Sequence, residues 1–179
     1  MLSIPISACE FWDEEAGEFR YVKQQNLVLE HSLVSISKWE AIHKKPFLSN
    51  EPKTSDEIMD YIRCMTLSPN VEPLVYTTLH DADYAKIQEY IDDPMTAAVF
   101  FDNGSGSSGG IITSETIYYW MISFNIPFEC QEWHLNKLLA LIKTCVKMNG
   151  PKKKKNKQEI FARNAALNAQ RRKMLKSKG

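Results

Sequence analysis

The residues from Thr113 to Met148 constrain the fold most, because they predict two apolar helices separated by a short elbow over 125–128. In each helix, apolar side chains recur at the i, i+3, i+4 and i+7 spacing, which places them on one helical face. The first set comprises Ile117, Trp120, Met121 and Phe124, and the second comprises Leu135, Leu138, Leu139, Ile142 and Val146. We expect the two faces to pack against each other as the centre of the core.

The charge of the chain is divided between two parts of opposite sign. Its 179 residues include 22 basic and 22 acidic side chains, so the formal net charge is zero. Residues 151–179 hold 11 of the basic residues and one of the acidic ones, which leaves +10 on this tail and −10 on residues 1–150. We therefore predict a globular, mainly helical domain over 1–150 and a basic helical tail over 151–179.

The N-terminal part predicts β-structure. Apolar residues alternate over 2–7 and, less regularly, over 19–30, as expected for short strands. An acidic turn from Trp12 to Glu18, with Gly17 near its end, separates them. This pattern is typical of a β-hairpin or small meander on the side of a helical body. The predicted fold class is therefore α+β, mainly α-helical.

Capping residues locate the helices between the strands and the core pair. Ser32 is suited to begin a helix over 33–42, and Thr54 with Glu57 forms a capping box that opens a helix through about Met65. The side chains expected to face inward are Leu33, Ile36, Trp39, Ile42, Ile58, Ile62 and Met65. A short helical turn around 73–79 and a helix over about 81–92, ended by Pro94, complete this region.

The segment 102–110 contains a G-x-G-x-x-G pattern at Gly104, Gly106 and Gly109. A dinucleotide site requires a helix that opens directly on the last glycine, within a βαβ unit. Here the next helix is expected only at Thr113. We interpret the segment instead as a flexible turn of a second hairpin, with strands over 95–101 and 111–112.

The sequence shows no motif for catalysis or for a metal ion. It contains no HExxH, no G-x-S-x-G and no P-loop. The four cysteines (Cys9, Cys64, Cys130 and Cys145) lack CxxC spacing, as expected for reduced thiols in the cytosol. We predict a protein that is not an enzyme and needs neither a metal nor a cofactor. A buried pair of carboxylates with different pKa values stays open as an enzymatic alternative.

Two groups of residues are candidates for binding a partner. The aromatic and apolar candidates are Trp39, Phe47, Tyr118, Trp120, Trp133, Ile160, Leu167 and Met174. For the aromatic ones the alternative role is packing in the core. The basic candidates are Lys152, Lys153, Lys154, Lys155, Arg163, Arg171 and Arg172. Because Ile160, Leu167 and Met174 recur at seven-residue spacing, they form a narrow apolar seam that suits a helix ordered by a partner.

Four segments together carry a resemblance to a known family. They are SLVSISKWE (32–40), KPFL (45–48), IYYWMISFNIPFECQEWHLNKLL (117–139) and, after a lysine-rich joint, RNAALNAQRRK (163–173). In these segments the chain resembles the tail assembly chaperones of tailed bacteriophages, which are encoded ahead of the tape-measure protein. The motifs are packing motifs, and the resemblance therefore assigns no binding residue.

The resemblance implies a helical chaperone in the cytoplasm of the infected bacterial host. Its expected partners are the apolar tape-measure protein, which it would keep soluble, and the tail-tube protein. The charged tail adds self-association to these expectations. No membrane partner is expected, because the longest apolar run, Ile117–Ile122, is far shorter than the roughly 20 residues that span a bilayer. The alternative function is nucleic-acid binding through the basic tail, which the acidic body disfavours.

Overall fold

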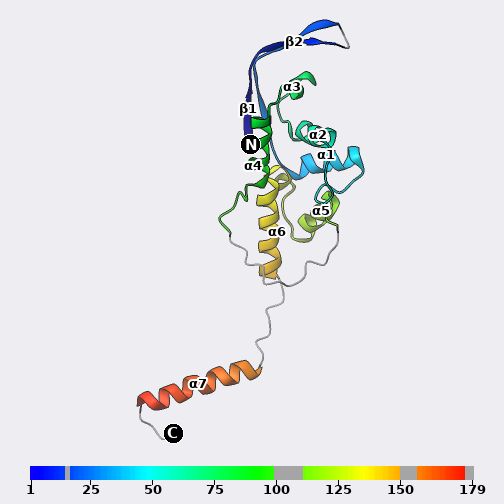
Figure 1. The fold of residues 1–179 in the computed structure, drawn as a ribbon. Helices are drawn as coiled ribbons and strands as arrows, with labels where there is room; N and C mark the ends of the chain where they lie inside the picture. The colour runs from blue at the N-terminus through cyan, green and yellow to red at the C-terminus, as the bar shows by residue number, and fades with distance from the viewer. Residues whose placement is uncertain (15–16, 99–110, 150–156, 176–179) are drawn as a thin grey trace. The chain divides into compact units, whose positions relative to one another are not determined.

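The computed structural model describes residues 1–14, 17–98, 111–149 and 157–175 (Figure 1). Their contacts divide the chain into two units, Met1–Cys145 and Val146–Gly179. The first unit contains four short strands and most of the helices, so the predicted class, α+β and mainly α-helical, is confirmed. The glycine-rich segment 102–110 and the tail lysines Lys152–Lys155 lie outside the described residues.

The elements follow one another as two pairs of strands and then helices. The strands are β1 (Leu2–Ile6), β2 (Cys9–Asp13), β3 (Glu18–Val22) and β4 (Gln25–Leu29). The helices are α1 (Leu33–His43), α2 (Ser55–Met65), α3 (Leu74–Thr77), α4 (Asp81–Asp92), α5 (Ser114–Ser123), the 3-10 helix η1 (Phe128–Glu132), α6 (Leu135–Asn149) and α7 (Lys157–Leu175). The boundary between the two units falls inside α6.

The strands form an antiparallel ribbon with two ladders. In the lower ladder β1 pairs with β4, and Ile4 lies opposite Leu27. In the upper ladder β2 pairs with β3, and Trp12 lies opposite Phe19. The predicted strands over 2–7 and 19–30 are present, but β2 occupies part of the segment expected to be an acidic turn. Gly17 has a φ of +64°, a left-handed conformation that suits glycine where the chain reverses.

The predicted caps of α1 and α2 are confirmed. The Ser32 hydroxyl accepts a hydrogen bond from the backbone N–H of Ser35 at 3.3 Å. The Thr54 hydroxyl accepts from the N–H of Glu57 at 3.3 Å, and the Glu57 carboxylate accepts from the N–H of Thr54 at 2.9 Å. Both caps involve residues three apart in the sequence, which is why the sequence located these helix starts.

Helix α1, rather than a pair formed by α5 and α6, lies at the centre of the first unit. It packs against α2, α5 and η1, while α4 packs against β1. The expected mutual packing of the helices over 113–148 is therefore corrected: the main neighbour of α5 is α1. Of the residues assigned to that core, Ile117, Met121, Leu135, Leu138 and Ile142 are buried, Trp120, Phe124 and Leu139 are partly buried, and Val146 is exposed.

Three other expectations about the body are wrong. Ile42 on α1 and Ile58 on α2 are exposed, because the helices present them to the side opposite the core. Residues 95–98 and 111–113 have no strand structure, so the described ends of the predicted second hairpin are irregular.

In the described part of the chain, no helix combines the length and apolar character needed to cross a membrane.

Candidate binding surfaces

Two of the predicted partner-binding residues, Trp39 and Phe47, belong to the body's aromatic packing. Trp39 is only 1% exposed, and its indole N–H donates to the backbone carbonyl of Glu57 at 2.8 Å. Phe47 packs between the rings of Trp39 and Tyr61, with centroid distances of 5.1 and 4.1 Å. Trp39 offers no surface to a partner, and we remove it from the candidate set. This outcome matches the alternative role in packing.

A second group of aromatic residues lies on α5 and η1 and defines what we call the α5–η1 surface. The ring of Tyr118 lies 6.4 Å from that of Phe128, and its hydroxyl donates to the side-chain carbonyl of Gln131 at 3.0 Å. Ile122 follows Tyr118 by one helical turn and therefore shares its side of α5. The exposed residues of this surface are Tyr119, Ile122 and Phe128, and Tyr118 is partly buried.

The two remaining aromatic candidates differ in exposure. Trp120 is partly buried and packs against the core cluster, so it contributes mainly to the body. Trp133 caps η1 and is 38% exposed, with the Lys137 ammonium 4.4 Å from its ring centroid. This cation–π contact covers one face of the ring, and the rest stays partly exposed beside η1. Tyr118 and Trp133 thus lie in the η1 region, which joins α5 to α6.

The described candidates in the second unit all lie on α7. Leu167 and Met174 are exposed, and so are Arg163, Arg171 and Arg172. Phe161 and Leu175 are also exposed, which adds apolar area to the seam. The side chain of Ile160 lies outside the described residues. Helix α7 therefore presents both apolar and cationic side chains to solvent.

The surface that the sequence interpretation missed lies on the upper ladder, β2–β3. Trp12 is 52% exposed, Phe19 is 66% exposed and Tyr21 is 59% exposed. Trp12 and Phe19 are cross-strand partners, and their rings meet edge to face with centroids 5.0 Å apart. Glu10 is paired with Tyr21, two residues along each strand, so all four side chains share one side of the ladder. We call this side the aromatic face of the hairpin.

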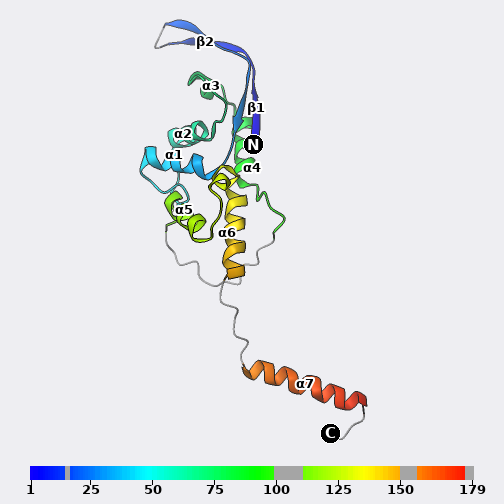
Figure 2. The same cartoon turned by 180° about the vertical axis from the view of Figure 1, so that it is seen from behind.

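The hairpin extends beyond the helices of the first unit. In Figure 1 and in Figure 2, β2 continues from β1 past α3 and away from α4. Its base is anchored by Val22, which is buried, and by Cys9 and Phe11, which pack against the core. The signal that could have identified the surface is the occurrence of aromatic residues on both sides of Gly17, with Trp12 five residues before it and Phe19 two residues after it. Interpreting Trp12–Glu18 as a turn concealed it.

A buried polar cluster lies where four segments of the body meet. It contains Glu30 and His31 after β4, Tyr61 on α2, Tyr90 on α4 and His134 before α6. The Tyr90 hydroxyl donates to the Glu30 carboxylate at 2.7 Å, and a short hydrogen bond joins His31 Nδ1 to the Tyr61 hydroxyl. The two imidazole rings stack edge to face with centroids 5.1 Å apart.

The hydrogen-bond partners of His134 and the burial of His31 determine how each ring is protonated. The N–H of Asn136 donates to His134 Nδ1 at 3.3 Å, so the ring proton resides on Nε2 and is donated to the Tyr90 carbonyl at 2.9 Å. Burial and, to a smaller extent, the neighbouring His134 lower the pKa of His31 to about 4, against a smaller raising effect of Asp92. The cluster is bonded internally and links distant segments, which gives it a role in the fold.

Buried carboxylates elsewhere also act as structural links. Glu40 on α1 accepts hydrogen bonds from the N–H of Phe47 and from the N–H of Ser114, each at 2.8 Å. The second bond places a carboxylate at the N-terminus of α5, where the helix dipole favours negative charge. Lys45 lies 2.6 Å from Glu57 and, together with the N–H of Thr54, lowers the pKa of that carboxyl group. Glu40 and Glu57 thus fasten α1 to its neighbours.

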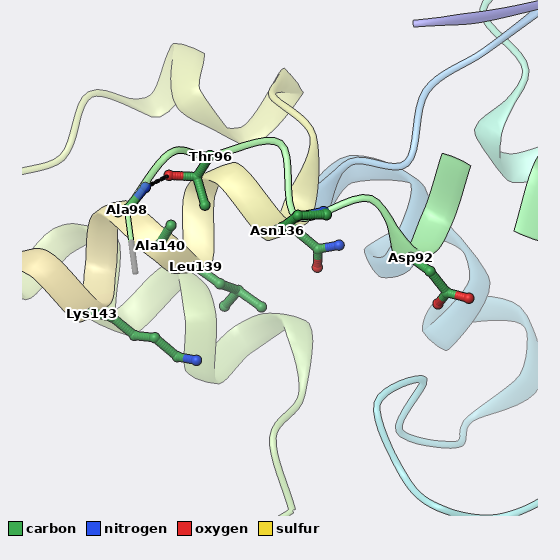
Figure 3. A pocket seen from close by; sticks show the side chains of 8 residues that line it. Asp92, Thr96, Ala98, Asn136, Leu139, Ala140 and Lys143 are labelled. Carbon is green, nitrogen blue, oxygen red and sulfur yellow. Dashed lines mark hydrogen bonds between the residues drawn. The ribbon is translucent and has the colours of Figure 1, made fainter. Parts of the chain in front are cut away.

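A cleft of about 360 Å³ lies between the end of α4, the segment that follows it and α6 (Figure 3). Asn136 stands in its wall and donates to the backbone carbonyls of Ile91 and Asp93, at 2.9 and 2.8 Å. In the same wall, the hydroxyl of Thr96 accepts from the N–H of Ala98 at 3.1 Å. The bonds of Asn136 hold the chain that follows α4 against α6, so this polar group of the cleft serves packing.

The cysteine thiols and the potential metal-ligating side chains of the described residues form no candidate site either. All four cysteines are free, and burial raises the pKa of the Cys64 and Cys130 thiols, which lowers their reactivity. No set of three or more potential metal-ligating His, Cys, Asp or Glu side chains comes together among the residues that are described. We take the exposed aromatic and basic surfaces as the candidates for binding a partner.

Comparison with known proteins gives no relative for the chain: no family model, no curated protein and no solved structure matches it.

Proposed function

We propose that this chain is a tail assembly chaperone of a tailed bacteriophage, a binding protein without catalytic activity. In this proposal it acts in the cytoplasm of the infected host, where it holds apolar segments of the tape-measure protein and presents them to the tail tube. The observation that carries the proposal is the α5–η1 surface, where Tyr119, Ile122 and Phe128 are exposed and the ring of Phe128 lies 6.4 Å from that of Tyr118 on α5. The resemblance of the sequence to such chaperones supports the same function.

The α5–η1 surface suits an amphipathic helix as its ligand. Helical clients present apolar side chains at the i, i+3, i+4 and i+7 positions to an apolar groove or face. Covering three large side chains contributes on the order of 5 kcal/mol before the cost of association is subtracted. After this cost the surface by itself supports at most weak, reversible binding, which suits a chaperone that must release its client. The Tyr118 hydroxyl, held by Gln131, adds a fixed polar point beside the apolar area.

The test is co-expression of the chain with the tape-measure protein of the same phage. We expect the wild-type chain to keep the client soluble and to be recovered with it, without ATP. The variant Ile122→Gln/Phe128→Ser should lose at least about tenfold in client recovery, since truncated hot-spot residues commonly cost this much. Ile58→Gln is the matched control, because Ile58 is an exposed apolar residue on α2, outside this surface.

The outcomes separate clearly. If the chain forms no complex with any tail protein, the proposed function is wrong. If Ile58→Gln weakens binding as much as the double variant does, the client uses a different surface. Circular dichroism of each variant should match the wild type, because all three substituted side chains are exposed in the body.

A second candidate function, nucleic-acid binding, is favoured by one observation. Arg163, Arg171 and Arg172 are exposed on α7, within a tail of net charge +10. Phosphate binding by such a tail would weaken steeply between low and physiological salt, because each contact releases a counterion. Capture of an apolar client should not weaken in this way as the salt concentration rises. A titration with duplex DNA at several salt concentrations therefore distinguishes this candidate from the chaperone.

A further inference from the structure

The aromatic face of the hairpin and helix α7 each expose large apolar side chains. On the hairpin these are Trp12, Phe19 and Tyr21, and on α7 they are Phe161, Leu167, Met174 and Leu175. Exposed aromatic side chains that share one face mark an interaction surface more often than isolated ones do. A helix gains most of its stability from packing an apolar face against another element. We therefore expect both surfaces to bind a partner.

The charges of the two surfaces are complementary. Residues 9–22, which form the hairpin, include five acidic side chains and one basic one, a net charge of −4. Residues 157–175, which form α7, include five basic side chains and one acidic one, a net charge of +4. Glu10 lies on the aromatic face itself, and Glu14 is exposed at the end of the hairpin. An acidic aromatic face of this kind favours a basic apolar helix.

The spacing of residues along α7 fits such a face. Leu167, Arg171 and Met174 follow one another at four and three residues, so they lie on the same side of the helix. Met174 can place its sulfur against an aromatic ring, and Arg171 can stack on one, both favourable contacts. Arg172 is the next residue after Arg171 and lies beside this stripe. From there it can reach acidic side chains at the edge of the hairpin face. One side of α7 thus offers a methionine sulfur and a guanidinium group, both of which can pack against the aromatic rings of the hairpin face.

We propose that the aromatic face of the hairpin, formed by Trp12, Phe19 and Tyr21, binds helix α7 of a second copy of this chain. Aromatic and apolar contacts hold the helix, while Glu10 and Glu14 steer its arginines. Each copy presents one hairpin and one α7, so the contact is head to tail. A head-to-tail contact closes into a ring or extends into a chain of subunits. This inference does not depend on the proposed function.

The first experiment measures self-association of the full-length chain by sedimentation velocity in the absence of any client. Trp12→Ser/Phe19→Ser should weaken association at least about tenfold. The charge reversals Glu10→Lys/Glu14→Lys and Arg171→Glu/Arg172→Glu should each weaken it as well. When both reversals are combined in one chain, positions 10 and 14 again carry charges opposite to those at positions 171 and 172, and association should be restored in part.

The control for net charge is Lys38→Glu/Lys44→Glu, which changes the charge by the same amount as the α7 reversal at exposed sites away from the hairpin. This variant should associate as the wild type does. If the combined reversal associates no better than either single reversal, the pairing of these two surfaces is wrong. A wild-type chain that is monomeric at all concentrations and salt levels would overturn the proposal as well.

The second experiment identifies the occupant of the hairpin. A chain labelled with heavy nitrogen carries the photo-crosslinking residue p-benzoylphenylalanine in place of Tyr21 and is mixed with unlabelled wild-type chain. We expect crosslinks from the labelled hairpin to unlabelled peptides of residues 157–175. Crosslinks only within labelled chains, or to peptides of residues 1–145, contradict the proposal. Since no client is present, failure here leaves the chaperone test unaffected, and the reverse also holds.

Discussion

The two halves of the N-terminal ribbon are alike in pairing and opposite in surroundings. Each ladder joins two five-residue antiparallel strands. In the lower ladder, Ile4, Leu27 and Leu29 are fully buried, whereas in the upper ladder Trp12, Phe19 and Tyr21 are exposed. The lower ladder is covered by α4, and the 66–68 segment bonds to the edge of β4, where the N–H of Leu67 donates to the carbonyl of Val28 at 2.8 Å.

The difference teaches that backbone pairing does not decide the role of a strand. Alternating side chains give each ladder two faces, and the tertiary neighbours determine whether a face becomes core or surface. One half of the ribbon therefore stabilises the body, and the other half is available for binding. The predictions below test this division, beginning with the largest expected effect.

The largest effect is expected in the lower ladder. Leu27→Ala should lower the free energy of unfolding by about 2–5 kcal/mol, because it removes a fully buried side chain and leaves a cavity. Tyr21→Ala, in the upper ladder, should lower it by less than about 1 kcal/mol. Urea unfolding followed by circular dichroism measures both. Equal losses would show that the two ladders are not divided into core and surface.

The next effect concerns pH and His31, which directly follows the lower ladder and Glu30. The folded-state pKa is about 4, whereas an unfolded histidine titrates near 6.5, so below about pH 6.5 the unfolded chain binds more protons. The stabilisation is complete above that pH and is lost as the pH falls toward 4. Between about pH 7 and pH 5, the free energy of unfolding should fall by about 2 kcal/mol from this residue.

The matched variants for the pH effect are His31→Gln and His80→Gln. His80 is exposed at the start of α4, so replacing it should leave the decrease unchanged. His31→Gln should reduce the decrease by the stated amount, whatever its effect on stability at neutral pH. A slope that is the same in both variants would assign the pH dependence to other groups.

A smaller effect is expected for the hydrogen bond between Tyr90 and Glu30, which ties α4 to the end of β4. Tyr90→Phe removes the hydroxyl that donates to the buried carboxylate, and should lower the free energy of unfolding by about 1–2 kcal/mol. The Glu30 carboxylate keeps the Met1 ammonium at 2.9 Å, which limits the loss. Tyr119→Phe, at an exposed site, should change nothing measurable in the same urea unfolding assay.

The smallest effect on stability is expected in the upper ladder. A double-mutant cycle between Trp12→Ser and Phe19→Ser should give a coupling energy of about 0.5–1 kcal/mol, the usual value for an edge-to-face cross-strand pair. The same substitutions should have their main effect on self-association. A coupling of several kcal/mol would mean that the aromatic face is part of the folded core.

The sequence by itself determined the elements that depend on neighbouring residues. The caps at Ser32 and Thr54 join residues three apart, and alternation along 2–7 is a property of a single strand, so both were predictable. The division into an acidic body and a basic tail also follows from the sequence alone, because charge is additive along the chain.

Only the tertiary structure decided which faces meet. The apolar side of α5 is evident from its period, but α1 and α6 offered equally apolar partners, and long-range packing selected α1. Likewise, Trp39 and Trp12 have the same side chain, and the sequence placed only Trp39 among the partner-binding candidates. In the structure the opposite holds: Trp39 is buried and Trp12 is exposed. Trp39 packs inside the body, whereas Trp12 lies on a hairpin that extends beyond the helices. Exposure is a property of the assembled fold, and local sequence patterns do not contain it.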